Sequence, residues 1–149
     1  ALPQDMPEEL TEGRAGAFVS IKKYGKLRGC IGTFLPAQQS LAEEILYNAV
    51  SAAAHDSRFE PIAVEELDRL VYSVDVLSTP EPITSAEELD PHVYGVIVKS
   101  VADRRRGLLL PDLAGIDTAE QQIAIAREKA HIMPKEPISL ARFTVVRHH

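Results

Sequence analysis

The chain has 149 residues, of which 45% are hydrophobic and 26% are charged, and this predicts a single compact globular domain with a sizeable core. Its formal net charge of -6 excludes bulk nucleic-acid binding, because neutralising phosphates requires a surplus of lysine and arginine. Its single cysteine excludes an internal disulfide, so we expect a reducing compartment, the cytoplasm.

The chain opens on a Pro- and Glu-rich lead-in over residues 1–14, with a short helix at 7–12. No charged-then-apolar leader precedes it, and the apolar runs further on are strand-sized. We therefore expect neither a signal peptide nor a membrane span.

Residues 16–34, "GAFVSIKKYGKLRGCIGTF", form two apolar runs broken by Tyr24-Gly25, the signature of a β-hairpin. A two-residue loop predicts the cross-strand pairs Lys23 with Lys26, Ile21 with Arg28, Val19 with Cys30 and Ala17 with Gly32. One face of the sheet then carries Val19, Ile21, Arg28 and Cys30, and the other carries Phe18, Leu27 and Ile31. Glycine within a strand indicates a bulge or a close approach by another group.

A long helix is predicted after Pro36, where Ser40 and Glu43 have the spacing of a capping box. The inward stripe is expected at Leu41, Ile45, Ala49 and Ala52, widened by Leu46, Val50 and Ala53.

The rest of the chain alternates short strands with helices. A loop and short helix at 57–70 lead to a strand at 71–78, and a connection with a second capping box, Ser85 to Glu88, follows. Strands are predicted at 93–100 and 107–113, a helix from Asp117 or Thr118 with Ile123, Ala126 and Ala130 inward, and a last strand around Ala141, Phe143 and Val145. Because hairpins dominate, the expected fold is α+β, a mainly antiparallel sheet flanked by helices.

Several of these segments resemble, in this order, the AMME chromosomal region gene 1 domain family. They are "GAFVSIKKYGKLRGCIGTF", "AVSAAAHDSRFEPI", "YSVDVLSTPEPI", "YGVIVKS" with "GLLLPDL", and "AREKAHI". Within the family the chain is similar to the bacterial branch called AmmeMemoRadiSam system protein A, from about Ala15 to the C-terminus. "LRGCIG" and "DSRFEP" are the most specific of these motifs.

The resemblance implies an α+β domain whose molecular activity is unsettled. Such proteins are encoded beside a Memo-like protein and a radical S-adenosylmethionine (SAM) enzyme, which implies an accessory or catalytic component of a modification pathway. Some members are fused behind a Memo-like domain, which leaves open that this chain is the C-terminal part of a longer protein.

Cys30 has two interpretations. As a nucleophile, its thiolate is favoured by Arg28, about 7 Å away on the same strand face. A base is also needed, and His55 is the candidate, with Asp56 as a second group to handle protons. Alternatively, Cys30 is a small buried residue opposite Val19.

The glycine-rich run has a second functional interpretation as an anion site. The backbone amides of Gly29, Cys30, Gly32 and Thr33 surround a small acidic or nucleotide-like ligand, with Arg28 as its charged clamp. The alternative is that both glycines serve only the bulge.

In the simpler interpretation, the segment "HDSRFEP" stabilises the turn after the long helix. Asp56 then makes local backbone hydrogen bonds, Arg58 pairs with a carboxylate and Phe59 anchors the loop. In the functional alternative, His55, Asp56 and Arg58 converge on the "RGCIG" strand and form one polar pocket with it.

Two further groups of residues complete the candidates. The five histidines, at 55, 92, 131, 148 and 149, lack the paired spacing of a zinc site, so no metal or other cofactor is predicted. Residues 103–107, "DRRRG", are expected to be a solvated hairpin tip, with a phosphate or partner contact as the alternative. The first hypothesis is therefore a binding or accessory domain, the second is an enzyme with Cys30 as its nucleophile, and the third is a purely structural interaction protein.

Overall fold

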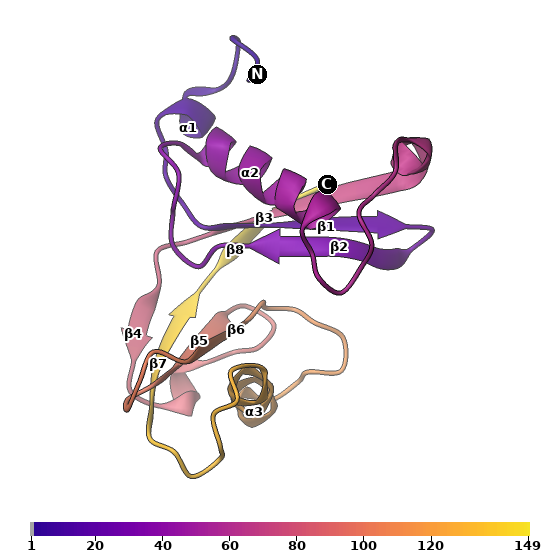
Figure 1. The fold of residues 1–149 in the computed structure, drawn as a ribbon. Coiled ribbons are helices and arrows are strands. Elements are labelled where there is room, and N and C mark those ends of the chain that lie inside the picture. The colour runs from indigo at the N-terminus through magenta and orange to yellow at the C-terminus, as the bar shows by residue number, and fades with distance from the viewer. Residues whose placement is uncertain (1) are drawn as a thin grey trace. The chain divides into compact units, whose positions relative to one another are not determined.

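The computed structural model describes residues 2–149, which divide into two compact units (Figure 1). Unit 1 comprises the chain up to Leu77 together with Val146–His149, and unit 2 comprises Ser78–Val145. Each unit has one four-stranded sheet and one long helix.

Unit 1 is built on a sheet with the strand order β2-β1-β3-β8. The strands are β1 (Ala17–Lys23), β2 (Lys26–Gly32), β3 (Leu70–Leu77) and β8 (Val145–His148). Strand β1 pairs antiparallel with both β2 and β3, which makes β2 an edge strand. Helix α2 (Leu41–Ala54) packs against β1 and β2, while α1 (Glu8–Thr11) contacts α2 and the 3-10 helix η1 (Val64–Arg69) precedes β3 (Figure 1).

The core of unit 1 lies between α2 and the sheet, where Val19, Ile21 and Ala52 are buried. Ser40 caps α2 as expected, because its side chain accepts a hydrogen bond from the Glu43 N–H. The predicted widening of the apolar stripe is wrong at two positions: Leu46 is 45% exposed and Val50 is 53% exposed. A helix that covers a sheet from one side buries only the stripe that faces it.

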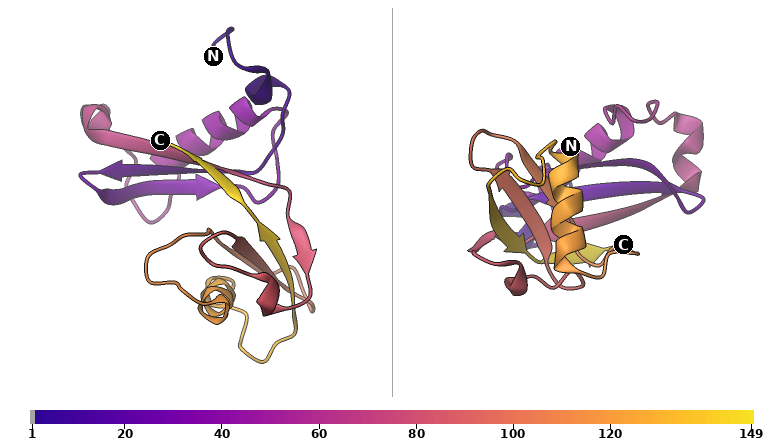
Figure 2. Two further views of the ribbon diagram at one scale, coloured as in Figure 1. Left: turned by 180° about the vertical axis from the view of Figure 1, so that it is seen from behind. Right: turned by 90° about the horizontal axis from the view of Figure 1, so that it is seen from below.

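Unit 2 has the strand order β4-β7-β5-β6. The strands are β4 (Glu81–Ile83), β5 (Gly95–Ser100), β6 (Arg106–Leu109) and β7 (Ile138–Phe143), and every pairing between them is antiparallel. Helix α3 (Ala119–Lys129), capped by Thr118, packs on β5 and β6, and the 3-10 helix η2 (Ala86–Glu88) has the predicted capping box at Ser85 (Figure 2). The core holds Val96, Val98, Leu109 and Ala126.

The predicted α+β, mainly antiparallel fold is confirmed, but the strands form two sheets instead of one. The last predicted strand divides at Thr144 into β7 and β8, which belong to different sheets. At this break, Ser78 and Thr144 bond to each other: the Ser78 N–H donates to the Thr144 carbonyl at 2.9 Å, and the Thr144 N–H donates to the Ser78 hydroxyl at 2.8 Å. A single-domain organisation stays a prediction.

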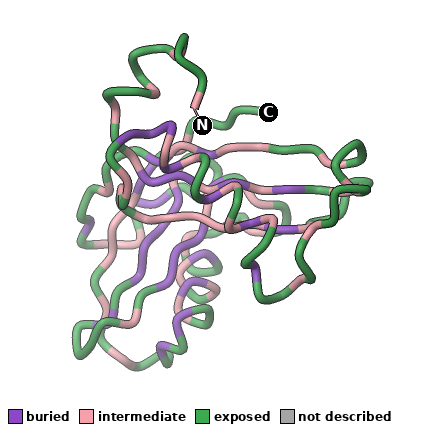
Figure 3. The backbone as a smooth tube through the Cα atoms, turned by 45° about the horizontal axis from the view of Figure 1, so that its top comes forward, coloured by how far each residue is buried: buried purple, intermediate pink, exposed green. Residues whose placement is uncertain are grey.

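Burial is concentrated on β1 in unit 1 and on β5 and β6 in unit 2, while most connecting loops are exposed (Figure 3). Over residues 2–149, no helix has the length and apolar character needed to cross a membrane.

Candidate functional site

The β1–β2 hairpin contains a bulge that the sequence pairing did not anticipate. The two-residue turn is confirmed, with Tyr24 and Gly25 both at positive φ and Lys23 opposite Lys26. The register then shifts between Lys22, which faces Leu27, and Ile21, which faces Gly29. Arg28 is therefore the extra residue of a β-bulge.

The bulge moves Cys30 to the other face of the sheet. Cys30 lies opposite Ser20, and its Sγ is 3.4 Å from the Ser20 hydroxyl. The predicted pairs of Val19 with Cys30 and Ile21 with Arg28 are therefore wrong, as is the shared face derived from them. Val19 and Ile21 pack under α2, whereas alternation along β1 turns Ser20, and with it Cys30, away from that helix.

Gly29 and Gly32 are explained by close packing. A Cβ on Gly29 would lie 2.2 Å from the carbonyl oxygen of Ala52 in α2, and a Cβ on Gly32 would lie 2.2 Å from the Phe18 ring. The expected bulge and close approach are thus both present, and the space beside each glycine is filled by the protein itself.

Arg28 fastens η1 to the hairpin. Its Nε and Nη2 donate to the two carboxylate oxygens of Glu66 at 3.0 and 3.1 Å, and its Nη1 donates to the Glu60 carbonyl at 2.7 Å. Lys23 also donates to Glu66, at 2.9 Å. These contacts, led by the Arg28 hydrogen bonds, lower the pKa of Glu66 to about 2. The Arg28 guanidinium, which was predicted to bind an anion, is therefore already paired with the Glu66 carboxylate.

Asp56 and Arg58 meet β2 at the backbone of Cys30. The buried Asp56 carboxylate accepts the Cys30 N–H through Oδ2 at 3.0 Å and binds Arg58 through both oxygens, at 2.7 and 3.0 Å. Arg58 Nη2 in turn donates to the Cys30 carbonyl at 3.3 Å. Because β2 is an edge strand, this charged pair satisfies a peptide that lacks a neighbouring strand on that side.

The electrostatics of the pair fix both charges. The hydrogen bond from Arg58, helped by the Cys30 and Arg58 amides and opposed by burial, holds the pKa of Asp56 well below its usual range. The pKa of Arg58 is raised by its hydrogen bond to Asp56 and by the negative charge of Asp56, against the opposing effect of burial. The Arg58 side chain is nevertheless 56% exposed, with its guanidinium carbon 5.3 Å from the centre of the Phe59 ring.

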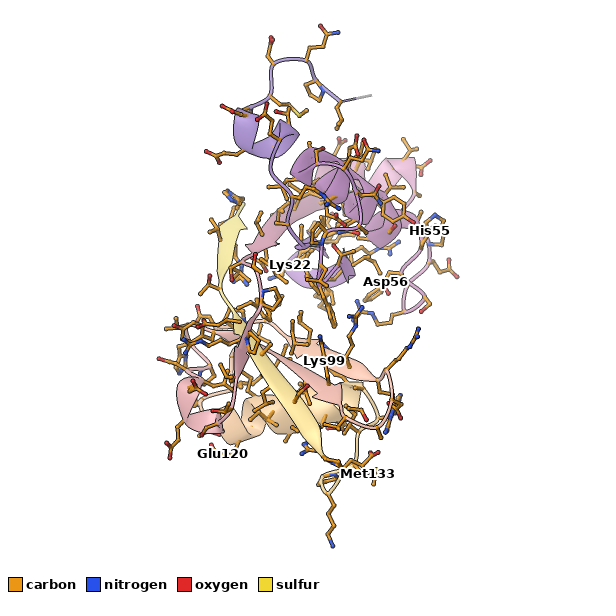
Figure 4. All side chains as sticks on the ribbon, turned by 90° about the vertical axis from the view of Figure 1, so that its left-hand side faces the viewer. Lys22, His55, Asp56, Lys99, Glu120 and Met133 are labelled. Carbon is orange, nitrogen blue, oxygen red and sulfur yellow. The ribbon has the colours of Figure 1, made fainter. Side chains whose placement is uncertain are left out.

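His55 sits beside this pair at the C-cap of α2, next to Asp56 (Figure 4). Its backbone N–H donates to the Ser51 carbonyl at 2.7 Å, and its side chain is exposed. Of the predicted site residues, the fold brings Asp56 and Arg58 to the Cys30 backbone, whereas Arg28 is bound to Glu66. An acid/base role for His55 stays a prediction.

The sequence matches the AMMECR1 family model over residues 1–148. The chain belongs to the AMMECR1 family. A Thermotoga maritima protein is 52% identical over 147 residues, covering 97% of this chain and 83% of the relative. A Clostridium acetobutylicum protein is 48% identical over 147 residues, which are 99% of this chain but 31% of the relative, so the chain spans under a third of that protein's length.

The AMMECR1 fold is also seen in a solved structure. An uncharacterized protein from Pyrococcus horikoshii superposes with a TM-score of 0.86 at 34% identity, covering 97% of this chain and 77% of that one. Membership of the family is therefore confirmed, as is the α+β fold that the resemblance implied, and the assignment to the AmmeMemoRadiSam branch stays a prediction.

This AMMECR1 chain also has a buried polar network that its sequence did not reveal. The Thr33 N–H donates to the Ala17 carbonyl at 3.1 Å and the Thr33 hydroxyl to the buried Glu44 carboxylate at 2.8 Å. Glu44 also accepts the N–H groups of residues 37 and 38, and Asn48 donates to the Ala17 carbonyl. With the Cys30 N–H bound by Asp56, two of the four amides predicted to hold an anion thus donate within the protein.

Glu44 and Asn48 interrupt the apolar pattern of α2, and that interruption is the sequence signal by which the network was detectable. Across the described part of the AMMECR1 chain, no three His, Cys, Asp or Glu side chains gather in a way that could hold a metal ion.

Proposed function

We propose that this chain is an accessory or binding domain that acts with Memo-like and radical SAM proteins in a modification pathway. Membership of the AMMECR1 family and the resemblance of its motifs to the AmmeMemoRadiSam branch support the proposal. So does the Clostridium relative, in which the matched segment is joined to a much longer chain. A cytoplasmic location is part of the proposal, since the single thiol suits a reducing compartment.

The proposed ligand is a small acidic or nucleotide-like molecule, bound where Arg58 meets the Cys30 peptide. The observation that carries this is that Asp56 fixes Arg58 at the Cys30 carbonyl while the Arg58 side chain stays 56% exposed. The proposal thus replaces Arg28 by Arg58 as the charged residue, because Arg28 is bound to Glu66. A guanidinium recognises phosphate or carboxylate, and the neighbouring Phe59 ring offers a surface for stacking a base.

Titration with AMP tests the proposal, monitored by calorimetry and by the amide NMR signals of residues 29–31 and 56–59. We expect saturable binding that Arg58→Ala weakens about tenfold, because one charge-assisted contact is lost. Arg69→Ala, which removes an exposed arginine of the same unit, is the matched control and should leave the affinity unchanged. Equal affinities in the two variants would contradict the assignment of Arg58.

A second candidate function is an enzyme that uses Cys30 as a thiol nucleophile. It is favoured by the half-buried position of Cys30 and by the Ser20 hydroxyl 3.4 Å from its sulfur. Asp56 is a weak proton acceptor near neutral pH because its pKa is strongly lowered, so His55 is the base in this alternative. Alkylation by iodoacetamide well below pH 8, slowed by Ser20→Ala, supports it, and labelling only after denaturation excludes it.

A further inference from the structure

The tip of the β5–β6 hairpin concentrates positive charge in a chain of net charge -6. From Lys99 to Arg106 there are four basic residues and one acidic residue, Asp103. Lys99, labelled in Figure 4, and Arg106 lie directly opposite each other at the ends of β5 and β6. Like charges directly opposite each other repel in a sheet.

The charge of Arg105 is already matched inside the protein. Its Nε donates to both carboxylate oxygens of Asp103 at 2.9 Å, and its terminal nitrogens donate to the Glu136 carboxylate. The pKa of Arg105 is accordingly raised, first by Glu136 and then by Asp103. Asp103 and Glu136 both bind Arg105, and the exposed side chains of Lys99 and Arg104 add two further positive charges at the tip.

These residues surround a hollow of about 400 Å³. It is lined by Lys99, Ser100, Asp103, Arg104, Arg105 and Arg106. The tip is held in shape by the Ser100 N–H, which donates to the Arg105 carbonyl at 2.9 Å, and by the Ser100 hydroxyl, which accepts the Ala102 N–H at 3.2 Å. The hollow therefore exists before any ligand arrives, and its volume is typical of a small-molecule site.

We propose that this hollow binds the phosphate group of a small phosphorylated molecule. A phosphate offers several oxygens to cations converging from both strands, and arginine matches that geometry with two parallel hydrogen bonds. A basic hollow confined to one hairpin tip fits a small ligand better than a nucleic acid, which requires an extended basic surface. The site lies in unit 2 and uses neither Cys30 nor Arg58, so it goes beyond the function proposed above.

Titration of the whole chain with inorganic pyrophosphate tests the inference, followed through the amide NMR signals of residues 99–106. We expect saturable shifts at these residues and weaker binding as KCl is raised, because exposed charges are screened. Arg104→Gln, which removes an exposed arginine at the tip, should weaken binding about tenfold. Arg69→Gln removes the same charge in unit 1 and should have no effect.

The inference is overturned by shifts that never saturate at residues 99–106, and also by equal affinity in Arg104→Gln and Arg69→Gln. Binding of a DNA oligonucleotide through the same residues without any response to pyrophosphate also overturns it, in favour of a nucleic-acid surface. Arg58→Ala should bind pyrophosphate normally, so a failure here is distinguishable from a failure of the AMP site.

Discussion

The Asp56 carboxylate accepts a hydrogen bond from the backbone N–H of Cys30 at 3.0 Å, across 26 positions of sequence. Together with Arg58, it connects the end of α2 to the edge strand β2. Removing the buried carboxylate would leave the Cys30 N–H without its acceptor, and an unsatisfied polar group typically costs more than the hydrogen bond contributes.

We expect Asp56→Ala to lower the free energy of unfolding by about 2 kcal/mol, chiefly because the Cys30 amide loses its acceptor. Urea denaturation measures the change. Asp68→Ala, which removes an exposed carboxylate from η1, should change stability by no more than about 0.5 kcal/mol. If the two variants have the same urea midpoint, the Asp56 contacts do not stabilise the fold.

The contribution of Asp56 should also depend on pH. Since its pKa is lowered by folding, the stabilisation is present above the usual value of 3.8 and is lost as the pH falls below it. The difference in unfolding free energy between the wild type and Asp56→Asn should therefore shrink between pH 5 and pH 2. A difference that stays constant over this range would contradict the assigned pKa direction.

The parts of this site that were predictable from sequence are those set by neighbouring residues. The Tyr24-Gly25 turn and the Ser40 cap depend on two to four residues each, and both formed as expected. The local part of the Asp56 and Arg58 interaction was predicted for the same reason, since the two residues are two positions apart.

A bulge was expected from the glycines, but its position at Arg28 was not predictable, because that position depends on contacts distant in sequence. It leaves Gly29 facing Ala52, 23 positions away, and leaves Arg28 bonded to Glu66, 38 positions away. A shift of one residue turns every following side chain to the other face, so this single unpredicted residue also misplaced Cys30.

The contact between Gly29 and α2 makes a direct prediction. Gly29→Ala places a methyl group 2.2 Å from the Ala52 carbonyl oxygen, so the helix has to move, and we expect a loss of about 2 kcal/mol or more. Thermal and urea unfolding measure this loss of stability. The control is Lys26→Ala, which removes an exposed side chain from the same strand. Normal stability of Gly29→Ala would mean that α2 lies farther from β2.

Arg28 is expected to act on stability and not on ligand binding. Arg28→Ala removes the contacts to Glu66 and Glu60, so the urea midpoint should fall and the amides of residues 64–69 should exchange faster with solvent. Hydrogen exchange followed by mass spectrometry measures this, with Arg69→Ala as the control. An Arg28→Ala protein of normal stability that no longer binds AMP would instead restore Arg28 as the anion clamp.

Glu44 is fully buried, and its carboxylate accepts three hydrogen bonds, from the Thr33 hydroxyl and from the N–H groups of residues 37 and 38. Glu44→Gln keeps the size of the side chain but replaces one acceptor oxygen by an NH₂ group, which faces donors and leaves at least one of them unpaired. We expect a loss of about 2 kcal/mol and faster amide exchange at residues 37 and 38. The control is Glu43→Gln, since Glu43 lies one position earlier and accepts a 3.3 Å hydrogen bond from the Gln39 N–H. This variant should change neither the stability nor the amide exchange. Equal effects from the two variants would mean that Glu44 does not hold the loop between β2 and α2.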